Sequence, residues 1–339
     1  MSSLLNKLKT LISSGDPTFS DADFIQLFQY QAESNTAYSA YAQLSQDKLD
    51  GITCWKDIPA IPTDAFKSAV NPTGFELNEH EVTTFLTSGT TAENKGAHHF
   101  RSTELYEKSI IAGWKSLGIP ELSANTLMLI PSSEEAPHSS LSHMMQTLKT
   151  EFCNDAHFLL SEGTLDINTF RVAAKSQQPI SLIGTALAFL QLFEQLEESD
   201  EYFTLPAGSW AMETGGYKGT NKSLTKEDLY LLFEKFLGLS EENIWNEYSM
   251  TELSSQLYTR GIGAPPRGPA WTRIKVIDPE TLQPVKPGEM GYLVIYDLAN
   301  YDSCMAIMTQ DLAIYHDELS FTLIGRDPSA LPRGCSRAL

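Results

Sequence analysis

Apolar and polar positions follow two different patterns along this chain. Between residues 103 and 198, short apolar runs alternate with longer segments in which apolar residues recur every three or four positions. Short runs such as TLMLIP (126–131) and ISLIGT (180–185) predict buried strands, and the longer segments at 103–117 and 186–198 predict amphipathic helices. We therefore expect strands and helices to alternate through this part of the chain.

The two ends of the chain have other patterns. Residues 1–16 and 20–50 carry apolar residues at helical spacing, and the first of these segments lacks the continuous apolar run of a signal peptide. Residues 58–67, IPAIPTDAFK, predict an extended segment because each proline biases its predecessor away from helix. From about 270 onwards, short β-rich runs are separated by turn sequences. These runs are WTRIKVID, GYLVIYDL, MAIMTQDLAIY and SFTLIG.

Alternating strands and helices followed by strands alone favour an α/β body with a β-rich part after it. We predict an α/β core over residues 1–325, divided into an α/β body (1–270) and a β-rich subdomain (271–325). A mobile tail is predicted for residues 326–339.

Composition and charge exclude several classes of protein. Of the 339 residues, 42% are hydrophobic, which provides a core, and the formal net charge of −19 disfavours nucleic acid and anionic membranes as partners. No apolar run approaches the ~18 residues of a membrane span. The four cysteines form no C-x-x-C pair, which argues against a disulfide scaffold or a zinc cluster. These features fit a reducing cytoplasm, the predicted location.

The most informative segment is a hydroxyl-rich loop, TSGTTAENKG (87–96). Its hydroxyls and backbone N–H groups, together with the ammonium of Lys95, can surround the oxygens of a polyphosphate. Five residues separate Gly89 from Lys95, so the spacing differs from that of a Walker A loop. An ordinary polar loop is the alternative interpretation.

Two later segments offer complementary chemistry. In ETGGYKG, Gly215 and Gly216 allow a flat ring to approach the backbone closely. In NEYSMTE, Tyr248 can stack on a purine, Thr251 can bind a phosphate oxygen and Glu252 can hold Mg²⁺. Taken alone, the first segment is typical of a simple turn and the second of a helix start.

The order of the segments resembles a known superfamily. TSGTTAENKG, the GGY turn, NEYSMTE, MTQD (308–311) and IGRD (324–327) follow the motif order of the adenylate-forming (ANL) superfamily of acyl-CoA synthetases, peptide-synthetase adenylation domains and luciferase. Finer features resemble the acyl-protein synthetases (long-chain-fatty-acid–protein ligases) of the bacterial luminescence fatty-acid reductase complex over nearly the whole chain. They are IPAIPTDAFK, ETGGYKG, YSMTELSSQLY, LVIYDLANYDSC and GRDPSALPRGCS. The implied fold is the superfamily's large N-terminal-type α/β domain, with mixed sheets flanked by helices and a β-rich subdomain.

The resemblance implies a role for each segment in binding ATP and Mg²⁺. The residues implied around the β- and γ-phosphates are Thr87, Ser88, Gly89, Thr90, Thr91 and Lys95. Those implied around adenine are Gly215, Gly216 and Tyr248. Thr251 would contact the α-phosphate and Glu252 would hold Mg²⁺. Asp311 would bind the ribose hydroxyls, and Arg326 would lie at the hinge motif, from where it could also reach the ribose.

This sequence also departs from the superfamily pattern. Ser249 and Gln310 replace usual glycines, and Asn94 replaces a usual proline. Elsewhere in the superfamily a small C-terminal domain with a catalytic lysine follows the hinge. This sequence ends at residue 339, soon after Arg326, so we expect that lysine to have no counterpart.

The tail contains Cys335, between Arg333 and Arg337. Nearby positive charge favours the thiolate, which is a strong nucleophile toward an acyl adenylate. In the resembling family a C-terminal cysteine accepts the acyl group as a thioester, and Cys335 matches it. An inert cysteine in a frayed terminus is the alternative. The remaining three cysteines, in apolar or strand-like contexts, are expected in the core.

The expected function is ATP-dependent activation of a carboxylic acid, by resemblance a long-chain fatty acid, to acyl-AMP with release of pyrophosphate. Lys95, Glu252 and Cys335 are the predicted catalytic residues. The thioester on Cys335 would then pass to a partner protein, by resemblance an acyl reductase. One alternative is a ligase that acylates CoA or a carrier protein, with Cys335 idle. The other is a non-catalytic nucleotide-binding scaffold.

Five further positions have two possible roles. His98 and His99 cannot both face one metal ion from a strand, because side chains alternate, so we expect neutral residues at the surface or beside phosphate. Phe189, Leu190 and Phe193 would line an acyl pocket or, as is commoner for a helical stripe, form core.

Overall fold

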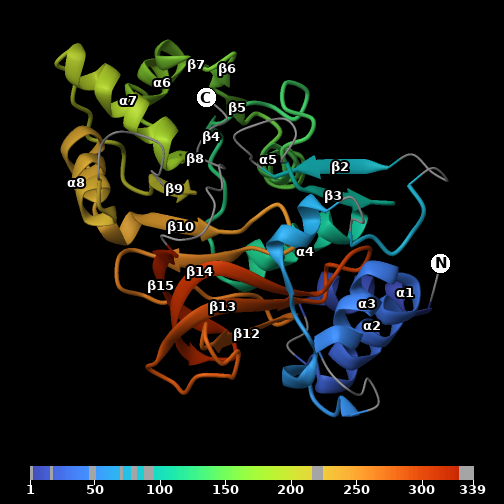
Figure 1. Cartoon of the computed structure of the whole chain (residues 1–339). Helices are drawn as coiled ribbons and strands as arrows, with labels where there is room; N and C mark the ends of the chain where they lie inside the picture. The colour runs from blue at the N-terminus through green and yellow to red at the C-terminus, as the bar shows by residue number, and fades with distance from the viewer. Residues whose placement is uncertain are drawn as a thin grey trace. The chain divides into compact units, whose positions relative to one another are not determined.

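The computed structural model describes residues 3–15, 18–45, 51–68, 72–77, 82–87, 95–215 and 224–327 (Figure 1). These residues form two compact units. The first comprises the described residues of Met1–Gly118, Met250–Leu257 and Pro265–Arg333. The second comprises those of Ile119–Ser249 and Tyr258–Ala264.

The second unit is built on a largely parallel sheet with the order β11-β10-β9-β8-β4-β5. The strands are β4 (Asn125–Leu129), β5 (His157–Phe158), β8 (Ile180–Thr185), β9 (Trp210–Thr214), β10 (Ile244–Tyr248) and β11 (Leu257–Arg260). The strand pairs from β5 to β10 are parallel, which requires crossover connections. The connecting elements are α5 (Ser140–Phe152), the hairpin β6 (Leu160–Ser161) and β7 (Thr164–Leu165), α6 (Ile167–Ala174), α7 (Ala186–Glu198) and α8 (Lys226–Leu237).

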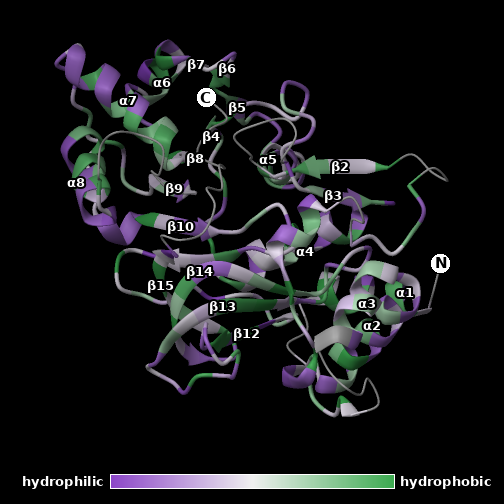
Figure 2. Ribbon diagram, in the orientation of Figure 1, coloured by the Kyte–Doolittle hydropathy of each residue, from purple (hydrophilic) through white to green (hydrophobic). Residues whose placement is uncertain are grey.

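An aromatic cluster forms the core between α7 and α8. Phe189 and Phe193 of α7 lie 4.6 and 5.0 Å, between ring centroids, from Phe233 of α8, and all three side chains are almost fully buried. Both helices alternate hydrophobic and hydrophilic positions, as amphipathic helices do (Figure 2). Burying each ring stabilises the fold by about 1.5–3 kcal/mol. The helical stripe at 186–198 is therefore core, as its spacing favoured.

The first unit contains a second sheet and four helices. Its strand order is β1-β14-β13-β12, with β15 paired to β14. The strands are β1 (Ile61–Pro62), β12 (Thr272–Ile277), β13 (Met290–Asp297), β14 (Ala306–Asp317) and β15 (Ser320–Arg326). Strands β2 (Thr83–Leu86) and β3 (Ala97–Phe100) form a separate antiparallel pair. The helices are α1 (Ser3–Ser14), α2 (Asp21–Ser34), α3 (Thr36–Ser45) and α4 (Glu104–Ser116).

Most elements predicted from periodicity are confirmed, and one is wrong in part. The helix and strand predicted for 186–198 and 180–185 coincide with α7 and β8. In the proline-paced segment 58–67, however, only Ile61–Pro62 are strand, and Thr63–Lys67 form a 3₁₀ turn. The fixed φ of Pro62 suits the entry to a helical turn as well as an extended chain.

Two of the three cysteines expected in the core are not fully buried. Cys304 is buried, but Cys54 and Cys153 are only partly buried. Both lie at ends of elements, since Cys54 precedes the 3₁₀ turn Trp55–Asp57 and Cys153 follows α5. An apolar neighbourhood in sequence therefore does not place a residue in the core when the chain turns there.

Within the part of the chain that is described, no helix is long and apolar enough to cross a membrane. The boundary at residue 270 and the tail 326–339 stay predictions, and residues 328–339 lie outside the described part.

Candidate active site

The stem of the hydroxyl-rich loop is closed by two hydrogen bonds in the first unit. The backbone N–H of Thr87 donates to the oxygen of Gly96 at 2.8 Å, and the N–H of Gly96 donates to Thr87 Oγ1 at 2.7 Å. Thr87 is 8% exposed, whereas Lys95 is exposed. Ser88, Gly89, Thr90 and Thr91 lie outside the described residues. The stem thus fixes where the predicted phosphate loop leaves and rejoins the β2–β3 pair.

The Thr251–Glu252 pair, also in the first unit, is held through its main chain. The oxygen of Thr251 lies 2.8 Å from Nδ1 of His98, and the oxygen of Glu252 accepts from Asn300 Nδ2 at 2.7 Å. The two residues are only 5% and 3% exposed. Their backbone is therefore anchored by buried polar side chains at two successive carbonyl groups.

The residues that follow are anchored by a buried carboxylate. Asp297 accepts from the N–H of Ser254 at 2.9 Å and from Ser255 Oγ at 2.7 Å. Burial raises the pKa of Asp297 to about 6, although these hydrogen bonds act to lower it. The carboxylate is therefore ionised at neutral pH and fixes the chain just after Glu252.

Asp311 and Arg326 lie opposite each other in the β14–β15 register. Gln310, which precedes Asp311 on β14, accepts a hydrogen bond from Arg326 Nη2 at 2.6 Å and donates one to Asp64 at 3.2 Å. A glycine at position 310 would have neither contact. The departure from the superfamily pattern at this position therefore gives Arg326 a side-chain partner on the neighbouring strand.

In the second unit, the two glycine- and tyrosine-containing segments follow adjacent parallel strands. Thr214 of β9 pairs with Glu247 of β10, and Gly215 and Tyr248 are the next residues along. The φ of Gly215 is +74°, a conformation that favours glycine. Ligands commonly bind at the carboxyl ends of such strands, so this edge fits the predicted adenine residues. Gly216 lies outside the described residues.

Two buried acids at this edge were not singled out by sequence. Glu213 accepts from Asn246 Nδ2 at 2.8 Å and lies 3.5 Å from the ammonium of Lys226. Glu247 accepts a hydrogen bond from the hydroxyl of Thr214. Burial raises the pKa of both carboxyls, that of Glu213 to about 7. The sequence shows an acidic residue in each of the segments ETGG and NEYS. It does not show that strands β9 and β10 pair there or that both acids are buried.

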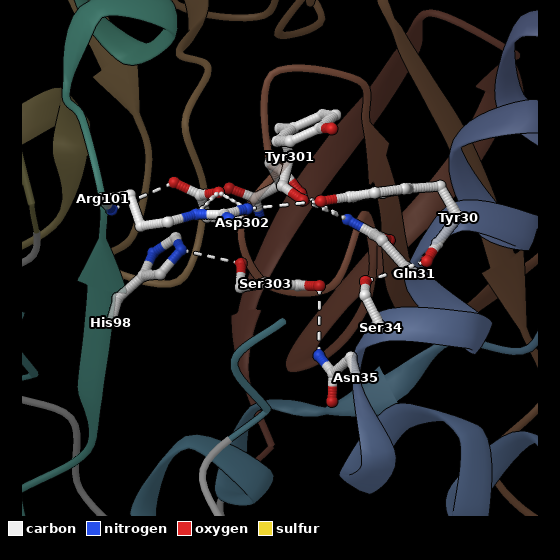
Figure 3. A network of polar contacts seen from close by, with 10 residues as sticks. Tyr30, Gln31, Ser34, Asn35, His98, Arg101, Tyr301, Asp302 and Ser303 are labelled. Carbon is white, nitrogen blue, oxygen red and sulfur yellow. Dashed lines mark hydrogen bonds and ion pairs between the residues drawn. The ribbon is translucent and has the colours of Figure 1, made fainter. Parts of the chain in front are cut away.

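His98 is fully buried, so a surface position for it is wrong. Figure 3 shows its ring bonded to Ser303, whose carbonyl oxygen in turn accepts from Asn35. Burial lowers the pKa of His98 to about 4, so the ring is neutral at pH 7, as expected. The next residue, His99, has a different partner. Its ring is hydrogen-bonded to Thr84 on the paired strand β2, as expected when neighbouring side chains point to opposite faces of a strand.

The same network ties the 300–303 turn to helix α2 and strand β3. Gln31 donates to the oxygens of Asn300 and Tyr301 at 2.6 and 3.2 Å (Figure 3). Arg101 forms an ion pair with Asp302 at 3.0 Å. The turn that carries Asn300 is therefore held by Gln31 of helix α2 and by Arg101, which follows strand β3.

The predicted Mg²⁺ ligand, Glu252, belongs to no cluster of metal-binding side chains in the described part of the chain. Among the described residues, no three His, Cys, Asp or Glu side chains gather as a metal cluster would. Glu252 offers one carboxylate, a hard oxygen ligand of the kind that Mg²⁺ takes from a protein when phosphates supply others. The residue present thus fits the predicted role.

Comparisons with known proteins agree on one family. The sequence pattern of the family described as acyl-protein synthetase, LuxE, matches residues 16–339. Long-chain-fatty-acid–luciferin-component ligase of Aliivibrio fischeri is 25% identical over 298 residues, covering 85% of this chain and 77% of that protein. The Vibrio harveyi protein of the same name is 24% identical over 305 residues, covering 86% and 78%.

Solved structures share the fold. An open conformation of 2-hydroxyisobutyryl-CoA ligase, in complex with 2-HIB-AMP and CoA, has a TM-score of 0.66 at 13% identity, covering 92% of this chain and 76% of that one. ATP-bound MatB from Rhodopseudomonas palustris has a TM-score of 0.50 at 14% identity, covering 72% and 47%. The mixed α/β architecture is that of the adenylate-forming superfamily, as the motif order predicted. With the family match extending over nearly the whole sequence, the chain belongs to the LuxE acyl-protein synthetase family of ligases.

Proposed function

We propose that this ligase activates a long-chain fatty acid with ATP and then carries the acyl group on its own Cys335. The observation that carries the proposal is the family match over residues 16–339, which includes every predicted motif and the cysteine itself. The names of the two curated relatives, both long-chain-fatty-acid ligases, support the choice of acid.

In the first step, a carboxylate oxygen of the fatty acid attacks the α-phosphorus of ATP. The bond from that phosphorus to the bridging oxygen of the β-phosphate breaks, and pyrophosphate leaves. Lys95 and the hydroxyl-rich loop would stabilise the charge on the leaving group, and Thr251 would bind an α-phosphate oxygen. Mg²⁺, held by Glu252, would neutralise phosphate charge when bound.

The remaining predicted residues would hold the nucleoside. Gly215, Gly216 and Tyr248 would enclose adenine, and Asp311 would accept hydrogen bonds from the ribose hydroxyls. Arg326 would lie beside the ribose, and its contact with Gln310 supports a fixed orientation for the guanidinium.

In the second step, the Cys335 thiolate attacks the acyl carbonyl carbon. The carbon–oxygen bond to AMP breaks, AMP leaves and a thioester remains. The proposed recipient of the acyl group is a partner acyl reductase. Arg333 and Arg337 support the step because flanking positive charge favours the thiolate.

The test separates the two half-reactions. Cys335→Ser should keep fatty-acid-dependent exchange of pyrophosphate into ATP and should lose acid-stable labelling by radioactive fatty acid. Cys153→Ser, which alters a partly buried cysteine in the second unit, is the matched control and should keep both.

Each alternative predicts a different outcome. If Cys335→Ser still acylates itself, another residue is the acceptor. If it instead acylates added CoA as fast as the unaltered protein does, the chain is a CoA ligase. Nucleotide binding without any acid-stimulated exchange in the unaltered protein would indicate a non-catalytic scaffold.

A further inference from the structure

The side chain of His98 is buried within the first unit. It lies on β3 and is 1% exposed, and its ring contacts the rings of Phe66 and Phe100 at centroid distances of 5.4 and 4.1 Å. Both ring nitrogens nevertheless have polar partners. Nδ1 lies 2.8 Å from the main-chain oxygen of Thr251, and Nε2 lies 2.7 Å from Ser303 Oγ.

These partners determine the tautomer. A carbonyl oxygen can only accept, so Nδ1 must carry the hydrogen. In a neutral ring Nε2 is then the acceptor, and the Ser303 hydroxyl donates to it. Ser303 is itself fixed, because its carbonyl oxygen accepts from Asn35 Nδ2 at 3.2 Å (Figure 3). Burial lowers the pKa of His98 to about 4, which agrees with a neutral ring.

The hydrogen bond joins two segments that are far apart in sequence. His98 follows Lys95 by three residues, on the strand that leaves the hydroxyl-rich loop. Its partner, Thr251, directly precedes Glu252, whose own carbonyl is held by Asn300 at 2.7 Å. One ring therefore couples the strand behind the predicted phosphate loop to the predicted phosphate and magnesium residues.

We propose that His98 is a positioning residue for acyl adenylation: its Nδ1–H bond to the Thr251 carbonyl sets the Thr251–Glu252 pair relative to the strand that follows Lys95. The proposal rests on the proposed roles of these three residues in ATP binding. The ring has no contact with substrate in this role. It acts by holding main chain, and the Ser303 hydroxyl acts by holding the ring in the tautomer that can donate.

Two amide side chains separate this role from simple packing. In His98→Asn, the side-chain nitrogen can take the place of Nδ1 and donate to Thr251, while the contact with Ser303 is lost. In His98→Gln, the amide reaches toward the place of Nε2 and Ser303, and the Thr251 carbonyl loses its donor. Both variants place a shorter or flexible amide among Phe66 and Phe100, so a packing role alone would affect them alike.

The experiment measures fatty-acid-dependent pyrophosphate exchange, with KM for ATP and kcat determined separately, beside the free energy of unfolding. We expect His98→Asn to stay within ~3-fold of the unaltered protein. We expect His98→Gln to lose at least ~10-fold in kcat/KM for ATP, the equivalent of one lost hydrogen bond, with KM for the fatty acid unchanged. In the unaltered protein, ¹⁵N NMR of the histidine ring at pH 7 should show a protonated Nδ1 and an unprotonated Nε2.

Equal exchange kinetics in the two variants, or an Nε2–H tautomer, would overturn the positioning role while leaving the proposed function intact. Loss of kcat/KM in proportion to loss of stability in both variants would also overturn it, since packing would then explain the result. An unaltered protein without acid-dependent exchange would instead overturn the proposed function, and this inference with it.

Discussion

A β-carbon on Gly96 would lie 3.1 Å from both Oγ1 and Cγ2 of Thr87. The same two residues exchange the hydrogen bonds that close the hydroxyl-rich loop. The absence of a side chain at position 96 therefore allows the loop to close at Thr87. Position 96 requires glycine because other atoms approach it closely. The same β-carbon would also lie 3.2 Å from the main-chain carbonyl carbon of Phe66.

Gly96→Ala should open this stem, because neither Thr87 nor the main chain at Phe66 can move without breaking a contact. We expect KM for ATP in pyrophosphate exchange to rise ~10-fold or more, with a loss of stability of about 1–3 kcal/mol. Gly113→Ala is the matched control. Gly113 lies inside helix α4, and a β-carbon there would be 3.8 Å from Trp271, an ordinary contact. This variant should keep its activity, and its free energy of unfolding should stay the same or rise by about 0.5–1 kcal/mol. Equal kinetics for the two variants would contradict a role for the stem.

Lys95→Met should weaken adenylation without affecting folding. The side chain is exposed, so its removal leaves the core unchanged, whereas the proposed charge on the leaving pyrophosphate loses its cation. We expect exchange to fall ~10²–10³-fold, measured with ATP and fatty acid at saturation. Lys108→Met on α4, where the ammonium has a surface partner at 3.7 Å, should leave exchange unchanged. A similar small effect for both lysines would remove Lys95 from the mechanism.

Asn300→Asp should disrupt the backbone that carries Glu252. The amide nitrogen donates to the oxygens of Glu252 and Cys304 at 2.7 and 3.0 Å, and a carboxylate would face both oxygens without a hydrogen to share. We expect the free energy of unfolding in urea to fall by on the order of 3 kcal/mol, with loss of exchange activity. Ser254→Ala removes only the hydroxyl donated to Asn300 and should cost about 1 kcal/mol. Full stability in Asn300→Asp would show that the amide is dispensable.

Glu213→Gln should change how stability depends on pH. Burial raises the pKa of Glu213 from 4.5 to about 7, so between these values the folded protein keeps a proton that the unfolded chain has released. The free energy of unfolding therefore falls as pH rises through this window, by on the order of 3 kcal/mol from this group. The glutamine variant should lack that fall and gain stability over the unaltered protein at pH 7.5 relative to pH 5.

The measurement is the difference in unfolding free energy between variant and unaltered protein at several pH values. Contributions from other buried acids, such as Asp297, cancel in that difference. Glu227→Gln, which changes an exposed acid near the start of α8, is the matched control for the same substitution at the surface. A pH-independent difference for Glu213→Gln would mean that Glu213 is ionised in the folded state.

The sequence by itself determined the elements whose residues carry the signal locally. The strand ISLIGT and the helix after it were predicted at their observed bounds, because the spacing of apolar residues is a local property of the sequence. Motif order likewise predicted the fold of the adenylate-forming superfamily, because the motifs are short local sequences. The roles of Cys335 and of the central loop residues stay predictions.

Only the tertiary structure decided which polar residues support the predicted site. His98, Asp297 and Asn300 are separated in sequence from Thr251 and Glu252, and nothing in their own segments says that they hold that backbone. Burial likewise decided the ionisation of Glu213, because desolvation depends on the neighbours that folding supplies. A periodic pattern states which side of an element is inside. It does not state which carbonyl a buried side chain will meet there.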